Sequence, residues 1–196
     1  MNWIKEYISK NPSPSELKLP LRFESADLSG IPEGKLQHCA KAYLENFWEA
    51  GNKGIGCLFL GKAGTYKTYT ACAIAKRIRT LANLETMFVQ CPIFVSQIER
   101  NRFSSKSEDM IKQVSRTPFV VMDDFSQIQP NSFGANLLLE VAEARFSNLR
   151  PTIWTGNIAI PVAKYNEIVK VITGIYGPSF GRRIVEASKG YGVVVE

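Results

Sequence analysis

The sequence predicts an α/β domain in which a parallel sheet carries a phosphate-binding loop. Short apolar runs alternate with segments of helical spacing, as in a parallel sheet that helices cover on both faces. The apolar run 57–60 leads into a glycine turn and then into Lys67 and Thr68. A later run, 119–122, ends in two aspartates, which is typical of a buried strand with acids at its carboxyl end. These three observations together predict the fold class.

The composition agrees with one domain that lies outside membranes. The chain has 196 residues, and its 45% of hydrophobic residues is enough for one full core. No apolar run approaches the ~18 residues of a membrane helix, and the N-terminus shows no export signal. The net charge of +6 permits contact with nucleic acid without requiring it. The cysteines form no C-x-x-C pair, so we expect buried free thiols and a cytoplasmic protein. The four cysteines are Cys39, Cys57, Cys72 and Cys91.

The N-terminal residues 1–22 are predicted to form a helix and a linker. Residues 1–10 place apolar side chains at helical spacing, so this helix either covers its own domain or binds a partner. A linker rich in proline and serine follows, and 19–23 is expected to be extended because a residue before proline avoids the helical region. The main domain is predicted over 23–196 and begins with a helix at 40–50.

The central motif is a phosphate-binding loop. The template G-x-x-x-x-G-K-[ST], between a strand and a helix, matches residues 61–68 except that Tyr66 replaces the second glycine. Backbone N–H groups and the start of the helix predicted over 68–81 would bind phosphates, Lys67 would reach the terminal phosphates, and the Thr68 hydroxyl would hold Mg²⁺. A lysine-containing turn without a ligand is the alternative. The predicted nucleotide contacts are Gly61, Lys62, Ala63, Gly64, Thr65, Tyr66, Lys67, Thr68 and Tyr69.

Between the loop and the acidic pair we predict a strand, a helix, a loop and a helix. Residues 85–90 form a short strand and 94–102 a helix. Residues 101–108 are polar and of mixed charge, which indicates a loop, and 110–114 is helical again.

The acidic pair at the end of the strand predicted over 118–122 points to chemistry. Ligands bind beyond the carboxyl ends of strands in an open α/β sheet, so both acids would lie beside the phosphate loop. We assign Asp123 to Mg²⁺, directly or through water, and Asp124 to polarising the attacking water. The alternative is that the two acids cap the next element.

The last third of the chain continues the alternation of helices and strands. A helix is predicted over 136–147 and a buried strand over 151–155. Asn157 follows that strand, where its amide would hold a water or the γ-phosphate. Helical segments run to about residue 187, and the apolar run 192–195 predicts a final strand.

With these pieces in order, the chain resembles an AAA+ ATPase of the bacterial helicase-loader group (DnaC/DnaI type) and its IstB-like transposition relatives. The resemblance rests on residues 60–68, 122–125, 150–157 and 180–184 and spans roughly 20–196. It implies a three-layer AAA+ fold with a central parallel sheet and no C-terminal lid domain, with ATP and Mg²⁺ as ligands.

The resemblance also implies individual roles. Lys67 and Thr68 match the Walker A contacts, Asp123 and Asp124 the Walker B pair, and Asn157 the sensor of the γ-phosphate. An arginine that reaches into a neighbouring subunit's site matches Arg183, with Arg182 as the second choice. An arginine acting in trans implies a ring or spiral of subunits.

Three functions remain open from the sequence. The first is a helicase loader that binds single-stranded DNA and a replicative DNA helicase. The second is an IstB-like transposition ATPase that binds duplex DNA and a transposase. The third is an AAA+ interaction module with weak or no hydrolysis, which the substitution at Tyr66 favours. Binding of single strands requires a basic groove with aromatic platforms. The candidates for that groove are Arg100, Arg102, Phe103 and Lys106.

Overall fold

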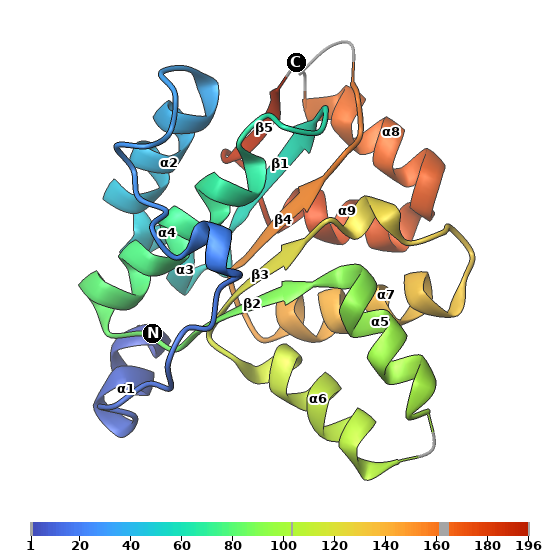
Figure 1. The fold of residues 1–196 in the computed structure, drawn as a ribbon, viewed down its shortest axis with the longest axis horizontal. Coiled ribbons are helices and arrows are strands. Elements are labelled where there is room, and N and C mark those ends of the chain that lie inside the picture. Colours follow the sequence, from blue (N-terminus) through green and yellow to red (C-terminus); the bar gives the residue numbers. More distant parts are fainter. Residues whose placement is uncertain (1, 103, 161–164, 196) are drawn as a thin grey trace.

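A parallel β-sheet forms the centre of the protein (Figure 1). The computed structural model describes residues 2–102, 104–160 and 165–195, and within them five strands pair in the order β2-β3-β4-β1-β5. Every pairing is parallel, as predicted. The strands are β1 (Cys57–Gly61), β2 (Thr86–Gln90), β3 (Phe119–Asp123), β4 (Thr152–Gly156) and β5 (Gly192–Val195).

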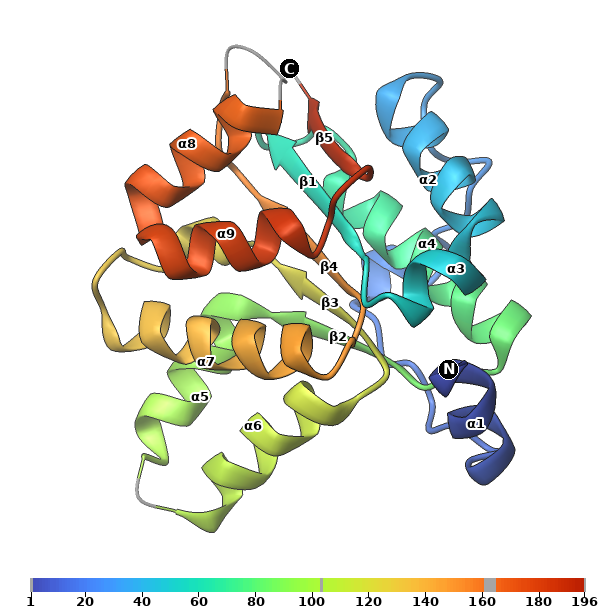
Figure 2. The ribbon, with the colours of Figure 1, turned by 180° about the vertical axis from the view of Figure 1, so that it is seen from behind.

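Helices cover both faces of the sheet, which gives three layers (Figures 1 and 2). One face packs against α1 (Trp3–Lys10), α2 (Lys35–Glu45), α3 (Phe47–Asn52) and α4 (Lys67–Ala82). The other packs against α5 (Cys91–Arg100), α6 (Ser105–Arg116), α7 (Phe133–Ser147), α8 (Tyr165–Tyr176) and α9 (Pro178–Glu186). Two short 3₁₀ turns complete the described elements, η1 (Leu21–Phe23) and η2 (Phe125–Gln127). None of the helices in the described residues has the length and apolarity to span a membrane.

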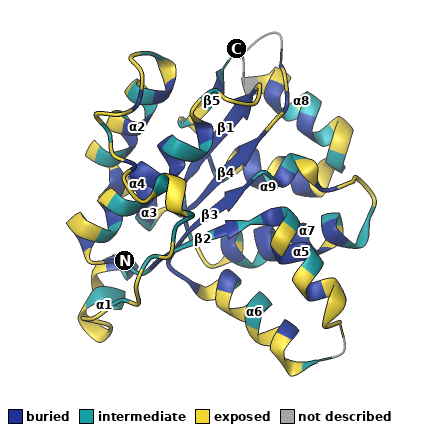
Figure 3. Ribbon diagram, viewed as in Figure 1, coloured by how far each residue is buried: buried dark blue, intermediate teal, exposed yellow. Residues whose placement is uncertain are grey.

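The three central strands, β1, β3 and β4, read as continuous apolar runs because both of their faces are buried, whereas the edge strands β2 and β5 are partly exposed (Figure 3). In β1, Leu58 and Leu60 belong to the core beneath α5–α9, whereas Cys57 and Phe59 belong to the core beneath α1–α4. All four side chains are at most 1% exposed. The alternation along the strand therefore divides one apolar run between two hydrophobic cores.

The cysteines behave as free thiols, in agreement with the prediction. None of them forms a disulfide; Cys57, Cys72 and Cys91 are buried and Cys39 is half-buried. Burial raises the pKa of Cys72 to about 12, which keeps this thiol protonated.

Three local predictions were wrong. The helix expected over residues 40–50 is two helices, because the chain leaves helical geometry at Asn46 (φ −102°, ψ 11°). A loop was expected over 101–108, but helix α6 already begins at Ser105. Lys112 and Glu108, one helical turn apart, form an ion pair of 3.1 Å that supports this helix. Leu21–Phe23 is a 3₁₀ turn rather than extended, since Pro20 restricts the residue before it and not the residues after it.

Helix α1 packs on its own domain. Ile4 is fully buried, and the backbone N–H of Ile4 donates to Asn52 Oδ1 at 3.3 Å. The hydroxyl of Tyr7 donates to Glu85 Oε2 at 2.8 Å, ahead of β2. The linker is held as well, because Asn83 Nδ2 donates to the Pro12 carbonyl at 2.7 Å. Of the two alternatives for residues 1–10, this structure shows the helix covering its own core.

A buried arginine ties together three segments on the α5–α9 side. Arg145, in α7, is 1% exposed. Its guanidinium donates to the carbonyls of Val114 (2.6 Å), Thr117 (2.8 Å) and Pro151 (2.9 Å) and to Thr152 Oγ1 (2.7 Å). Burial lowers the pKa of Arg145 to about 9, so the group stays charged at neutral pH. These bonds satisfy carbonyls at the end of α6 and join α7 to the starts of β3 and β4.

Substitution of this arginine tests its structural role. We expect Arg145→Met to lower the free energy of unfolding by about 3 kcal/mol or more, because it leaves buried carbonyls without partners. Urea unfolding followed by circular dichroism measures the change. Arg100→Met, at an exposed position, is the matched control and should stay within ~0.5 kcal/mol of the parent. Equal stability of the two variants would contradict the role given to Arg145.

Candidate nucleotide-binding site

The phosphate loop joins β1 to α4 and has the backbone shape that its template requires. A Cβ on Gly61 would lie 1.9 Å from the Val195 carbonyl oxygen, so this position accepts only glycine. Tyr66, at the position of the second template glycine, adopts the left-handed conformation (φ 62°, ψ 10°). That conformation costs a residue with a side chain about 1–2 kcal/mol. The helix α4 starts directly afterwards at Lys67, so its N-terminal N–H groups face the loop.

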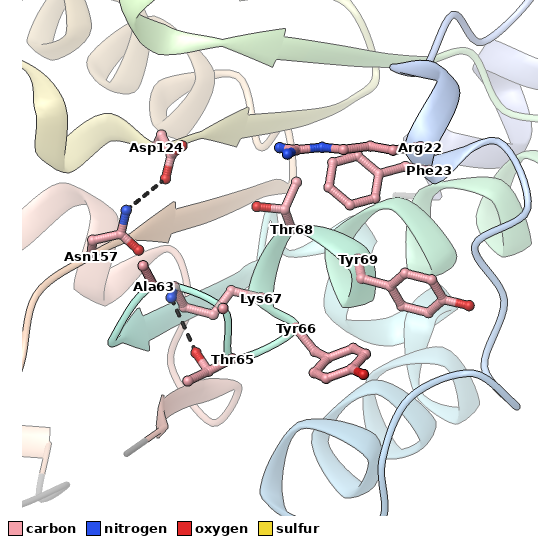
Figure 4. Close-up of a pocket in the computed structure, with 11 residues that line it drawn as sticks. Arg22, Phe23, Ala63, Thr65, Tyr66, Lys67, Thr68, Tyr69, Asp124 and Asn157 are labelled. Atoms are coloured by element: carbon pink, nitrogen blue, oxygen red, sulfur yellow. Dashed lines mark hydrogen bonds between the residues drawn. The ribbon is translucent and has the colours of Figure 1, made fainter.

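The loop forms one wall of a pocket of about 460 Å³ (Figure 4). Asp124 enters the pocket from the end of β3 and Asn157 from the end of β4, as predicted. Of the nine predicted nucleotide contacts, Gly61 and Lys62 do not line the pocket and shape the loop behind it. The residues that line the pocket are Arg22, Phe23, Ala63, Gly64, Thr65, Tyr66, Lys67, Thr68, Tyr69, Asp124 and Asn157.

The Lys67 ammonium group donates hydrogen bonds to neutral oxygens of the loop. The residue is 5% exposed, and Nζ donates to the Lys62 carbonyl and, at 3.2 Å, to Thr65 Oγ1. Burial lowers the pKa of Lys67, while the nearby charges of Asp124 and Asp123 oppose that change. Among the described residues, no carboxylate forms an ion pair with Lys67. The ammonium therefore has weak partners that phosphate oxygens can replace.

Asp123 lies at the back of the site and links three elements. Its Oδ1 accepts from Thr68 Oγ1 at 2.7 Å and from Thr155 Oγ1 at 2.6 Å, whereas its buried Oδ2 has no partner. Burial raises the pKa of Asp123, although the two hydroxyl bonds lower it again. A buried carboxylate oxygen beside a threonine hydroxyl is a donor set that fits Mg²⁺. Thr68 and Asp123, the predicted metal ligands, are thus brought together.

Asp124 points into the pocket, where its carboxylate is held by two amides. Oδ1 accepts from Asn157 Nδ2 at 3.2 Å, and Oδ2 accepts from Gln127 Nε2 at 3.1 Å. The left-handed backbone of Asp124 (φ 55°), with its N–H donating to Thr155 Oγ1 at 3.0 Å, turns this side chain away from that of Asp123. The two aspartates are therefore placed for different tasks, one at the back and one facing the ligand.

Sequence reasoning missed four residues of the site. Arg22 and Phe23 line the pocket, with the Arg22 guanidinium 4.5 Å from the centre of the Phe23 ring. They come from η1, which the chain path brings over the start of α4, and no local pattern marks them. Thr155 and Gln127 orient the two aspartates. A polar residue in an apolar strand run was a signal for Thr155.

The two arginines predicted to act in trans do not line this chain's own pocket. Arg183, in α9, donates through Nε to both Glu143 carboxylate oxygens at 2.8 Å, and its guanidinium lies 4.7 Å from the centre of the Phe146 ring. Arg182 is exposed on the same helix. The Arg183 side chain therefore lies on the surface formed by α7 and α9, and Arg182 is exposed to solvent.

The DNA-binding candidates lie around the turn between α5 and α6, remote from the phosphate loop in Figures 1 and 2. Arg100, Arg102 and Lys106 are exposed there. Phe103 lies outside the described residues. The Arg102 guanidinium lies 4.6 Å from the centre of the Phe133 ring at the start of α7. The structure brings the three basic residues to one end of the molecule.

Solved structures show the same fold. The chain superposes on the DnaC helicase loader with a TM-score of 0.79 at 21% identity, covering 90% of this chain and 100% of that one. The superposition on DnaI has a TM-score of 0.72 at 17% identity and covers 92% of this chain and 96% of the DnaI chain. The superposition on the replication initiator DnaA, solved with AMPPCP and single-stranded DNA, has a TM-score of 0.68 at 13% identity. It covers 90% of this chain and 51% of the DnaA chain. These similarities establish a P-loop fold of the AAA+ type.

The family assignment comes from the sequence itself. Among curated proteins, none matches this chain. The family model of the IstB-like ATP binding proteins matches residues 42–169, which include the phosphate loop, both aspartates and Asn157. With the pocket described above, this match shows that the chain belongs to the family of IstB-like ATP binding proteins.

Proposed function

We propose that this protein is an ATP-dependent replication factor that binds single-stranded DNA and loads or remodels a replicative helicase. The observation that carries the proposal is the fold match with the DnaC helicase loader, which extends over that whole chain and 90% of this one. The DnaA structure bound to single-stranded DNA supports the same class of nucleic acid. The assembled pocket supports a nucleotide-driven activity.

The pocket residues divide the work on ATP between them. The loop N–H groups and Lys67 would bind the β- and γ-phosphates, and Thr68 and Asp123 would hold Mg²⁺, which would neutralise phosphate charge. Asp124 orients the attacking water, and the Asn157 amide, 3.2 Å from its carboxylate, keeps Asp124 in place. Arg22, Phe23 and Tyr69 lie at the end of the pocket that remains for the nucleoside.

Completion of the site in trans is part of the proposal. Arg183 is turned away from its own pocket and engaged with Glu143, on a surface about one third exposed (36% for each side chain). An exposed ion pair of this kind adds little stability, because water and salt screen it, so Arg183 can exchange Glu143 for a phosphate of a neighbouring subunit at little cost. A ring or spiral of subunits would bring the arginine and the pocket together.

Two other functions have specific support. The family match favours an IstB-like transposition ATPase that binds duplex DNA and a transposase. The strained loop residue Tyr66 favours an interaction module with weak or no hydrolysis. Against the second alternative, Figure 4 shows the Tyr66 ring on the side of the loop away from Asp124 and Asn157, so the phosphate side stays open.

Removal of the loop cation tests the phosphate site. We expect Lys67→Ala to weaken ATP binding at least 100-fold, because a buried charge-assisted contact to phosphate is lost. Isothermal titration calorimetry with ATP and Mg²⁺ measures the affinity. Lys62→Ala is the matched control, since Lys67 contacts the carbonyl of Lys62 and not its side chain. Unchanged affinity in Lys67→Ala would mean that the phosphates bind elsewhere.

Removal of the surface arginine tests catalysis in trans. We expect Arg183→Ala to retain ATP binding and to lower the assembled protein's hydrolysis rate by about 10³-fold or more. Steady-state release of phosphate, measured against protein concentration, provides the rate. Arg182→Ala, one residue away and exposed, should change the rate little. Normal turnover in Arg183→Ala would reject the assignment.

The helicase assignment is tested by the mass of the complex. We expect light scattering of this protein mixed with the host's replicative helicase to show a defined complex that depends on ATP and Mg²⁺. Fluorescence anisotropy across salt concentrations should show tighter binding to single-stranded than to duplex DNA. The Lys67→Ala variant is the control for the nucleotide dependence. No helicase complex together with a preference for duplex DNA would favour the transposition ATPase instead.

A further inference from the structure

Tyr66 is unfavourable in the free protein for two separate reasons. Its backbone is left-handed (φ 62°), a conformation that glycine adopts without strain. Its ring is also exposed, with 49% of the residue accessible, so burial of the ring does not offset the strain. A strained residue that the surrounding structure nevertheless maintains is a reason to look for a function.

Among the described residues, the ring of Tyr66 meets one other aromatic ring, and that ring is fixed in place. The Tyr66 and Tyr69 rings meet edge to face, with centroids 5.9 Å apart and planes at 77°. The Tyr69 hydroxyl accepts from the Asp27 N–H at 3.3 Å. The same hydroxyl lies against Gly30, where a Cβ would be only 2.0 Å away. Tyr69 is therefore held by the segment before α2, and Tyr66 rests against its ring.

Both rings line the pocket at the end away from the catalytic polar groups. Figure 4 shows Tyr66 and Tyr69 on the opposite side of the loop from Asp124 and Asn157. Phe23 lines the same pocket beyond Thr68. If the phosphates occupy the loop, this aromatic end is the part of the pocket that remains for the nucleoside. An exposed aromatic ring offers a flat apolar surface that matches a purine.

We infer that Tyr66 is a direct contact for the nucleoside of a bound purine nucleoside triphosphate and that it sets affinity and preference for purines. The inference rests on the ATP site of the proposed function. The strain and exposure of Tyr66 are present in the free protein, and the contact with the nucleoside offsets them in the bound state. Tyr66 is then a binding residue and not a defect of the loop.

The test separates the nucleoside from the phosphates. Calorimetric titrations with ATP, CTP and inorganic tripolyphosphate, each with Mg²⁺, are made on the parent, Tyr66→Phe and Tyr66→Gly. Tripolyphosphate occupies the loop but has no nucleoside. We expect Tyr66→Gly to weaken the binding of ATP about 10-fold and to reduce the ratio of ATP affinity to CTP affinity. The affinity for tripolyphosphate should be equal to that of the parent or higher. Tyr66→Phe should behave as the parent, because the ring is retained.

Each other outcome overturns the inference in a distinct way. Tighter ATP binding by Tyr66→Gly would mean that the ring only obstructs the site, and equal ATP binding would mean that the ring makes no contact with the nucleoside. A parallel loss of ATP and tripolyphosphate would mean that Tyr66 shapes the phosphate loop and makes no nucleoside contact. Unchanged nucleotide binding with loss of the helicase complex would make the ring a protein contact. A parent protein that binds neither ATP nor tripolyphosphate would instead overturn the ATP site itself, and the inference with it.

Discussion

One buried carboxylate connects the parts of the site. Asp123 ends β3, and its Oδ1 accepts hydrogen bonds from Thr68 at the start of α4 and from Thr155 in β4. Thr155 Oγ1 also accepts a hydrogen bond from the backbone N–H of Asp124, so the direction of the Asp124 side chain depends on Thr155 too. Burial of an ionised carboxylate is costly unless it is bonded, and here one oxygen is bonded twice while the other has no partner. The position of the phosphate loop relative to β3 and β4 thus depends on a group that is satisfied only in part.

The order of the strands explains why these groups meet. Strand β1 pairs with β4, and β4 pairs with β3, so the loop, Asn157 and the aspartates follow three adjacent strands. All these strands are parallel, and their carboxyl ends therefore share one edge of the sheet. The chain crosses from β1 to the distant edge strand β2 and then returns strand by strand, which places residues 33 positions apart, such as Asp124 and Asn157, side by side. The sheet order is thus as important to the site as its residues.

The strands and the positions of residues at their ends could be predicted from sequence where a local pattern is sufficient. The five strands, and the places of the phosphate loop, the two aspartates and Asn157 at the carboxyl ends of β1, β3 and β4, follow from apolar runs and from the residues that end them. Arg22 and Phe23 could not be found in this way, because the path of the N-terminal segment over α4 depends on tertiary contacts such as Lys76 Nζ with the Glu24 carbonyl. The partner of Arg183, Glu143, lies 40 residues away and leaves no local signal either. Long-range pairing is the common reason for these omissions.

The two template glycines of the loop are under different physical constraints, which changes what Tyr66 means. At Gly61 any Cβ would collide with the Val195 carbonyl, a backbone atom that cannot turn away. At position 66 the backbone of this structure has a φ of 62°, a value that is open to other residues at a moderate cost. The template treats both positions alike because glycine meets either requirement. A side chain at the second position therefore strains the loop without closing it, and a tyrosine there is compatible with a working phosphate site.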